Sequence, residues 1–191
     1  MGRRSDHTSE ELHQMILDAT EQLISDGGLH NLSARKISRT IGYTVGTLYN
    51  VFEHLDDILL HVNARTLDAI YEAMTVPNSS AGLQDMSKKY LLFAQENPQK
   101  WHILFEHRLK PEHSLPIWYQ QKIDRLFGLV EQAVSRDFPN CSDASLTGRT
   151  IWAGIHGICT LGLSNTLERT GSPDPSLLID RLLLAFEINI E

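Results

Sequence analysis

Apolar residues recur along most of this chain at intervals of three and four positions, which is the spacing of one face of an α-helix. Stretches with this spacing alternate with short segments rich in glycine, proline, serine and asparagine, which terminate helices. The pattern predicts an all-α fold of about nine helices. Outside the segment 32–53, the predicted helices cover residues 9–25, 56–74, 83–96, 98–109, 116–136, 143–169 and 175–190.

The segment 32–53 predicts two short helices joined by a tight turn. Ser33 and Thr44 can each cap a helix with the side-chain hydroxyl, and Gly42 between them tolerates the positive φ of a turn. Two short helices around a glycine turn are typical of a helix-turn-helix. The second helix, over 44–52, has an apolar stripe with i, i+3, i+4, i+7 spacing at Val45, Leu48, Tyr49 and Phe52.

The motif GYTVGTLYNVF in this segment resembles the recognition helix of the TetR family of one-component transcription regulators. The matching positions are Gly42, Thr44, Gly46, Thr47, Leu48, Tyr49 and Phe52. The resemblance implies a DNA-binding domain over residues 1–54 and a helical effector-binding and dimerisation domain over 55–191. It also implies that DNA is contacted by Ser33, Arg35, Lys36, Tyr43, Thr44, Gly46, Thr47, Tyr49 and Asn50.

The same resemblance implies a ligand-responsive regulator, usually a repressor, that binds double-stranded operator DNA as a homodimer. Each subunit would place the helix over 44–52 in a major groove. Because the two grooves must face the same side of the duplex, the half-sites would lie about one DNA turn apart, or a multiple of it, as an inverted repeat.

The charge balance argues against tight non-specific DNA binding. The formal net charge is −7, and the first sixty residues hold five arginines and lysines against nine acids. A DNA-binding domain usually presents a basic surface. Arg3 and Arg4 could form a basic arm, but Val45 and Leu55 stand where the family often carries lysine. The alternative interpretation is therefore a helical protein-interaction scaffold with a degenerate DNA-binding domain.

The segment Trp152-Ala-Gly-Ile-His156-Gly, with FAQENPQ before it, resembles the Trp…His-Gly signature of one TetR effector-domain subfamily. In the TetR family the last two helices form a four-helix dimer interface. The final predicted helix, over 175–190, is too apolar for a lone surface helix, which fits burial against a partner subunit or in its own core. Small residues that would let helices approach closely are Ala153, Gly154, Gly157 and Gly162.

Aromatic residues on the C-terminal helices indicate a candidate effector pocket. Such pockets are mostly apolar with a few polar anchors, so the expected effector is a small apolar molecule. Aromatic residues at helical spacing also form ordinary core, and a histidine among them can make a purely structural hydrogen bond. The candidate ligand-binding residues are Trp101, Phe105, Trp118, Tyr119, Trp152 and His156.

Neither catalysis nor metal binding is expected. His102, Glu106, His107 and His113 lie near one another, but HILFEH has three residues between its first histidine and the glutamate, where the inverted zinc-peptidase motif has two. The chain shows no nucleophile elbow, P-loop or paired carboxylates. We therefore expect no enzyme, metal or cofactor, with a small helical metal enzyme as a third interpretation.

The two cysteines and the lengths of the apolar runs indicate the cellular compartment of the protein. Cys141 and Cys159 show no CxxC spacing, so a reducing compartment is the simpler interpretation. The first residues, MGRRSDHTSEE, lack the apolar stretch of a signal peptide, and no apolar run is long enough to span a bilayer. The sequence predicts a cytoplasmic protein that does not associate with membranes.

Overall fold

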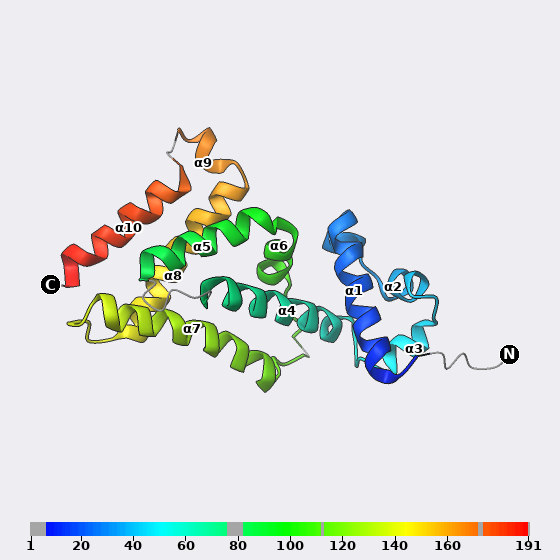
Figure 1. Ribbon diagram of the computed structural model, residues 1–191. Helices are drawn as coiled ribbons and strands as arrows, with labels where there is room; N and C mark the ends of the chain where they lie inside the picture. Colours follow the sequence, from blue (N-terminus) through cyan, green and yellow to red (C-terminus); the bar gives the residue numbers. More distant parts are fainter. Residues whose placement is uncertain (1–6, 76–81, 112, 172–173, 191) are drawn as a thin grey trace. The chain divides into compact units, whose positions relative to one another are not determined.

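The computed structural model describes residues 7–75, 82–111, 113–171 and 174–190 (Figure 1). Within these ranges the regular secondary structure is entirely helical, with helices α1 to α10 and one short 3₁₀ helix, η1. The predicted all-α fold is confirmed. The predicted basic arm at Arg3 and Arg4 lies outside the described residues.

The chain divides into two compact units. Unit 1 is Met1–Thr66 with Gln99–Pro116, and unit 2 is Leu67–Pro98 with Ile117–Glu191. Helix α4 (Leu55–Thr75) contributes to both units. The other helices of unit 1 are α1 (Ser9–Gly27), η1 (Leu29–Asn31), α2 (Ala34–Thr40), α3 (Val45–Tyr49) and α6 (Pro98–Glu106).

Helix α1 begins and ends where its local sequence directs. The Thr8 hydroxyl accepts the amide N–H of Glu11, and the Glu11 carboxylate accepts the amide N–H of Thr8, which completes a capping box. Gly28, at a φ of 72°, ends the helix in a conformation that residues with a side chain rarely adopt. The buried side chains of α1 pack in a core that also holds residues of α2, α3 and α4 and of the segment after α3. The buried residues of this core are Ile16, Leu17, Ala19, Ile37, Leu48, Phe52, Ile58 and Val62.

A second, smaller core explains why residues 99–116 belong to unit 1. Ile24 of α1, Leu59 of α4 and Ile103 of α6 are all buried and pack together. The compact units thus do not coincide with the expected boundary after residue 54, because α6 returns to pack on the N-terminal helices. Where the functional boundary lies stays a prediction.

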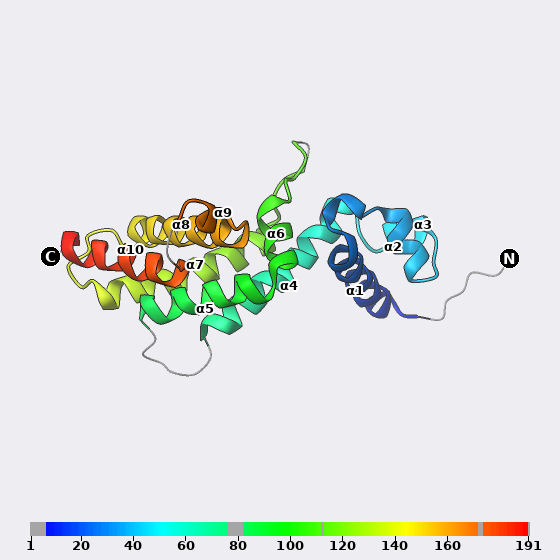
Figure 2. The ribbon, with the colours of Figure 1, turned by 90° about the horizontal axis from the view of Figure 1, so that it is seen from above.

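Unit 2 is a bundle built around α8 (Ala144–Leu163), which packs on α5, α7 and α10 (Figure 2). At Gly154 an added Cβ would lie 2.7 Å from Cδ2 of Leu182, so this glycine allows α8 and α10 to approach closely. Gly157, one turn later, has nothing within 4 Å of an added Cβ. The remaining helices are α5 (Leu83–Glu96), α7 (Ile117–Asp137), α9 (Thr166–Arg169) and α10 (Pro175–Ile190).

Three predicted helices end at least three residues away from the observed helix end. The single helix expected over 143–169 is wrong: α8 ends at Leu163, and α9 follows Asn165, whose φ of 54° is left-handed. Helix α3 ends at Tyr49, earlier than the expected residue 52, and α6 ends at Glu106 rather than 109. None of the helices in the described ranges combines the length and apolarity that crossing a bilayer requires.

Candidate nucleic-acid interface and ligand cavity

Two hydroxyl groups position the helix-turn-helix of unit 1, as the sequence predicted. The Ser33 hydroxyl accepts the amide N–H of Lys36 at 3.3 Å and caps α2. The Thr44 hydroxyl accepts the amide N–H of Thr47 at 3.1 Å and caps α3. Gly42 lies between them at a φ of 75°, so the turn has the left-handed residue that its sharpness requires.

Burial fixes which face of α3 is available to a partner. Leu48 and Phe52 are 0% and 2% exposed and anchor the helix to the core. Tyr49, predicted in the same apolar stripe and as a DNA contact, is 44% exposed. Asn50 and Gly46 are exposed as well. The surface of α3 that the core leaves open is therefore formed by a tyrosine, an asparagine and a bare helix backbone.

No contact among the described residues requires glycine at position 46. An added Cβ there would meet only the Thr44 hydroxyl oxygen, at an ordinary contact distance of 3.7 Å. Alanine would suit a helix better than glycine. The glycine keeps the surface of α3 flat, which is useful where a nucleic-acid backbone must come close.

The other predicted DNA-contacting residues lie beside α3. Arg35 is exposed on α2, and so is Lys36, whose ammonium group donates to the side-chain carbonyl of Asn31. The Tyr43 hydroxyl in the turn is 2.6 Å from Nδ1 of His7. The structure therefore places eight of the nine predicted residues on α2, on α3 or at their caps, and the ninth, Tyr43, in the turn between the two helices.

Part of the acidic charge of unit 1 is neutralised on α1. One guanidinium nitrogen of Arg65, on α4, lies 2.7 Å from the Asp18 carboxylate and 2.8 Å from that of Glu21. These two acids were among those that weighed against DNA binding. Because they are paired with a cation, they repel phosphate less than the sequence count indicates.

The six predicted effector-binding residues fall into three pairs. Trp101 packs against Phe105 in unit 1, with ring centroids 4.8 Å apart, and Trp101 is only 2% exposed. In unit 2, Trp118 contacts Tyr119 edge to face, and Trp152 stacks on His156 with centroids 5.3 Å apart. Their role in ligand binding stays a prediction.

Tyr90, which the sequence analysis did not single out, connects the last pair. The Trp152 indole N–H donates to the Tyr90 hydroxyl at 3.0 Å, and that hydroxyl is 3.3 Å from Nδ1 of His156. Burial lowers the pKa of His156 and raises the pKa of Tyr90. Both groups are therefore neutral near pH 7, and the Tyr90 hydroxyl can donate to the imidazole.

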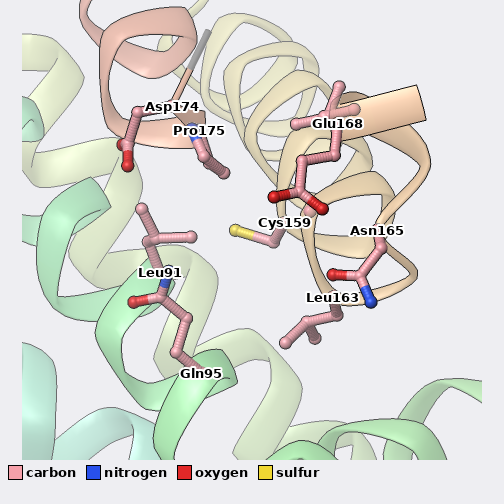
Figure 3. Close-up of a pocket in the computed structure, with 10 residues that line it drawn as sticks. Leu91, Gln95, Cys159, Leu163, Asn165, Glu168, Asp174 and Pro175 are labelled. Atoms are coloured by element: carbon pink, nitrogen blue, oxygen red, sulfur yellow. The ribbon is translucent and has the colours of Figure 1, made fainter. Parts of the chain in front are cut away.

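A cavity of about 380 Å³ lies in unit 2 where α8 breaks (Figure 3). Its polar atoms come from Gln95 of α5 and from the chain around the break, while Cys159 of α8 supplies a thiol. Burial raises the pKa of the Cys159 thiol to about 12, so the thiol is neutral. None of the six predicted effector residues lines this cavity. The lining residues are Leu91, Gln95, Cys159, Gly162, Leu163, Asn165, Leu167, Glu168, Asp174 and Pro175.

Solved structures with the same fold cover nearly the whole chain. The regulatory protein SCO4313 aligns with a TM-score of 0.76 at 18% identity, over 97% of this chain and 98% of its own. A protein of unknown function from Rhodococcus sp. RHA1 aligns with a TM-score of 0.69 at 18% identity, over 99% of this chain and 97% of its own. FadR from Bacillus subtilis, in complex with stearoyl-CoA, aligns with a TM-score of 0.59 at 17% identity, over 90% of this chain and 95% of its own. At these identities the likeness shows the fold alone.

Family sequence models provide the stronger finding. The family described as "Bacterial regulatory proteins, tetR family" matches residues 16–62, which contain the helix-turn-helix. The family described as "Tetracyclin repressor-like, C-terminal domain" matches residues 83–186, more than half of the chain. No curated protein is similar enough in sequence to count as a relative. The two matches, in their expected order along one chain, show that it belongs to the TetR family of bacterial transcription regulators, which act by binding DNA rather than as enzymes.

Proposed function

We propose that two copies of this chain bind an inverted-repeat operator as a repressor, and that a small apolar effector releases them. The observation that carries the proposal is the surface of α3, where Leu48 is fully buried while Tyr49 and Asn50 face outward. A tyrosine hydroxyl can donate to phosphate, and an asparagine can pair with the edge of adenine in the major groove.

The outer faces of α8 and α10 support a homodimer. On α8, Leu146 and Leu161 are 63% and 43% exposed, and the open position of Gly157 lies between them. On α10, Leu177 and Leu184 are 58% and 41% exposed. Exposed apolar residues on two neighbouring helices are what a symmetric four-helix interface would bury.

The cavity at the break of α8 supports an effector site in unit 2. Its volume of about 380 Å³ is within the range of small-molecule sites, and leucines and a proline line it together with a few polar groups. FadR from Bacillus subtilis is known in complex with stearoyl-CoA, so long-chain acyl-CoA belongs in the first set of ligands to test. The resemblance to the Trp…His-Gly subfamily makes Trp152 and His156 further effector contacts to examine.

An effector would act by population shift. The dimer would have one state whose recognition helices fit successive major grooves and one state whose helices do not. If the effector binds the second state more tightly, it lowers the affinity for DNA, at most by the ratio of its binding constants for the two states. Titrating the effector into the protein–DNA complex should then release the DNA, and small apolar compounds should be tried alongside long-chain acyl-CoA.

The test of DNA binding uses the duplex upstream of the protein's own coding sequence. Fluorescence anisotropy should show binding that is tighter than to a shuffled duplex and that weakens as salt rises, because phosphate contacts release counterions. Equal affinity for both duplexes would contradict an operator-specific regulator. Absence of binding to either would favour the scaffold interpretation, which the acidic charge and the apolar Leu55, packed on the core of unit 1, still support.

Gly46→Ala should change stability and DNA affinity in opposite directions. The added methyl group has room and favours the helix, so thermal unfolding should shift upward by the equivalent of at most about 1 kcal/mol. The same methyl group stands between α3 and the nucleic-acid backbone, so affinity for the upstream duplex should fall. A variant that is more stable and binds as tightly as the wild type would show that Gly46 does not face DNA.

A further inference from the structure

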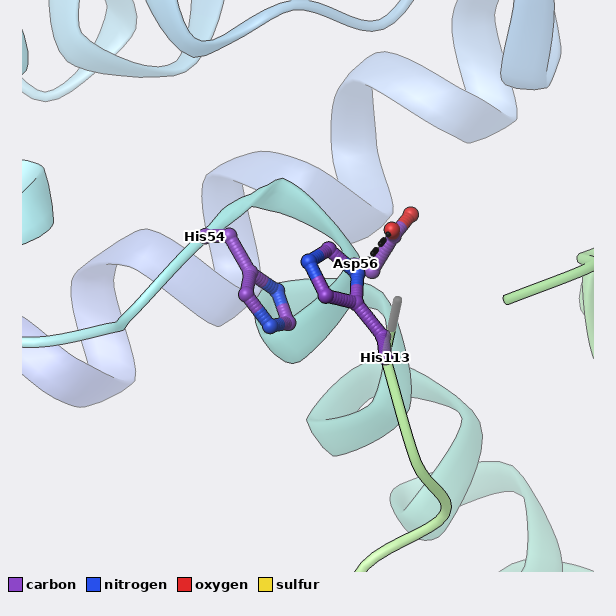
Figure 4. Close-up of side chains that lie close together, drawn as sticks. All are labelled: His54, Asp56 and His113. Carbon is purple, nitrogen blue, oxygen red and sulfur yellow. Dashed lines mark hydrogen bonds and ion pairs between the residues drawn. The ribbon is translucent and has the colours of Figure 1, made fainter. Parts of the chain in front are cut away.

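Two histidines and an aspartate from distant parts of unit 1 meet at the start of α4 (Figure 4). His54 and Asp56 flank the first residue of that helix, and His113 comes from the segment that follows α6, 57 residues away from Asp56. One donor atom from each of the three lies within 4.8 Å of the others, and all three residues are partly buried. The spacing along the sequence does not reveal this group.

The Asp56 carboxylate is held by both of its oxygens. Oδ2 lies 2.7 Å from Nδ1 of His113, and Oδ1 lies 3.2 Å from Nε2 of His107. The side chain of His107 is only 6% exposed, and its Nδ1 is 3.5 Å from the amide nitrogen of the buried Asn63. His107 therefore orients the Asp56 carboxylate, and Asn63 orients His107, in the way that residues hydrogen-bonded to metal ligands hold those ligands in place.

The two imidazoles that complete the group already lie face to face. The rings of His54 and His113 stack with centroids 3.6 Å apart and an angle of 12° between their planes. A neutral imidazole has one ring nitrogen with a lone pair, and that nitrogen is the atom that can bind a metal ion. His54 uses its lone pair at Nδ1 to accept the amide N–H of Asp57 at 2.9 Å.

We propose that His54, Asp56 and His113 bind a divalent transition-metal ion such as Zn²⁺. Two imidazole nitrogens and a carboxylate oxygen suit Zn²⁺, Co²⁺ or Ni²⁺, whereas Mg²⁺ and Ca²⁺ prefer oxygen ligands alone. With three protein ligands, a water molecule takes the fourth position of a tetrahedron. The ion takes the place of the hydrogen between Nδ1 of His113 and Asp56, and the displaced proton moves to Nε2 of the same ring, so that the imidazole stays neutral. The ion also takes the place of the Asp57 amide N–H as the partner of Nδ1 of His54.

The ion would tie the segment after α6 to the junction between α3 and α4. Closing a loop of this length removes many conformations from the unfolded chain, so metal binding should stabilise unit 1. The proposal concerns the binding of the ion and does not depend on operator DNA.

The test uses the full chain without a histidine tag, stripped of metal by a chelator and dialysed. Titration with Zn²⁺ in competition with a chromophoric chelator should give equimolar binding, and Zn²⁺ should raise the melting temperature. Co²⁺ should give the visible absorption of a tetrahedral site. Mg²⁺ should have no effect at the same concentration.

Variants locate the site. His113→Ala and His54→Ala should each lose binding by about a hundredfold or more, and His107→Gln should weaken it by about 10- to 100-fold, since it acts through Asp56. His102→Ala is the matched control, because His102 is exposed on α6 and pairs only with Glu106 among the contacts described. It should bind Zn²⁺ like the wild type.

Three results would overturn the proposal: less than equimolar Zn²⁺, unchanged affinity in both His54→Ala and His113→Ala, or equal loss in His102→Ala. His54 caps α4, so its variant could lose structure for another reason. Circular dichroism identifies that case, and His113→Ala then decides alone, because His113 lies outside the helices.

Discussion

Gly157→Arg should convert the proposed dimer into folded monomers. Position 157 lies on α8, and among the described residues nothing is within 4 Å of a Cβ added there. Arginine is also a better helix former than glycine, so the monomer should not be destabilised. In a symmetric interface the substitution places two unpaired charges where apolar residues should pack, at a cost of about 2–5 kcal/mol each.

Light scattering after size-exclusion chromatography measures this change directly. The wild type should have twice the mass of the variant, and thermal unfolding of the variant should become independent of concentration. Because one subunit holds a single half-site, affinity for the upstream duplex should also fall, by about 10²- to 10⁴-fold.

Gly128→Arg is the matched control. Gly128 is on α7, outside the proposed interface, and it too has nothing within 4 Å of an added Cβ. This variant carries the same change in charge and should remain dimeric. If Gly157→Arg stayed dimeric while α8 and α10 kept their structure, the interface would have to lie elsewhere.

The parts of the fold that depend on neighbouring residues could be predicted from the sequence. Ser33 and Thr44 were each predicted to cap a helix, and each hydroxyl accepts the expected amide N–H. A cap needs only residues three positions apart, so the signal is complete within one segment. The same holds for Gly42, whose positive φ ends the first helix of the helix-turn-helix.

The break in α8 shows where local signals fail. Asn165 turns the chain with a left-handed φ, but the run around it has no proline, and glycine at position 162 still lies within the helix. Asparagine adopts this conformation in a minority of cases, so the sequence alone favours a continuous helix. The cavity lined by Cys159 and Asn165 exists because of the break, and so it was missed as well.

Groups formed by distant residues were equally hidden. His113 was weighed with His102 and Glu106 because they are close in sequence, yet the structure pairs His102 with Glu106 and brings His113 to Asp56. Helix α6 packs through Ile103 on Ile24 of α1 and Leu59 of α4, and this packing brings the segment after α6, with His113, to Asp56. Periodicity predicts which face of a helix is buried, but not what it packs against.

The double variant Thr47→Ala/Tyr49→Phe should lose most of its affinity for the upstream duplex while remaining as stable as the wild type. Neither hydroxyl is essential to the fold. Tyr49 is 44% exposed, and the Thr44 hydroxyl keeps the amide N–H of Thr47 as the partner of its cap when the Thr47 hydroxyl, 3.0 Å away, is removed. Stability should therefore change by no more than about 0.5 kcal/mol.

The loss of affinity follows from counting hydrogen bonds. If each hydroxyl contributes about 1 kcal/mol and a symmetric dimer presents each twice, binding weakens by about 4 kcal/mol, or about a thousandfold. No charge is removed, so the slope of log affinity against log salt should be unchanged, unlike the result of deleting a cation that contacts phosphate. Anisotropy titrations at several salt concentrations measure both quantities.

Thr75→Ala/Tyr71→Phe removes the same two groups from the unit 2 end of α4. Thr75 is exposed, and the ring of Tyr71, which lies under the Arg125 guanidinium, is retained as phenylalanine. Affinity for DNA should stay at the wild-type value in this control.

If the α3 variant bound like the control, the exposed face of α3 would not be the DNA-binding surface, and the scaffold interpretation would replace the regulator model for this chain. If both variants lost affinity equally, a general loss of structure would explain the result, and thermal unfolding would reveal it.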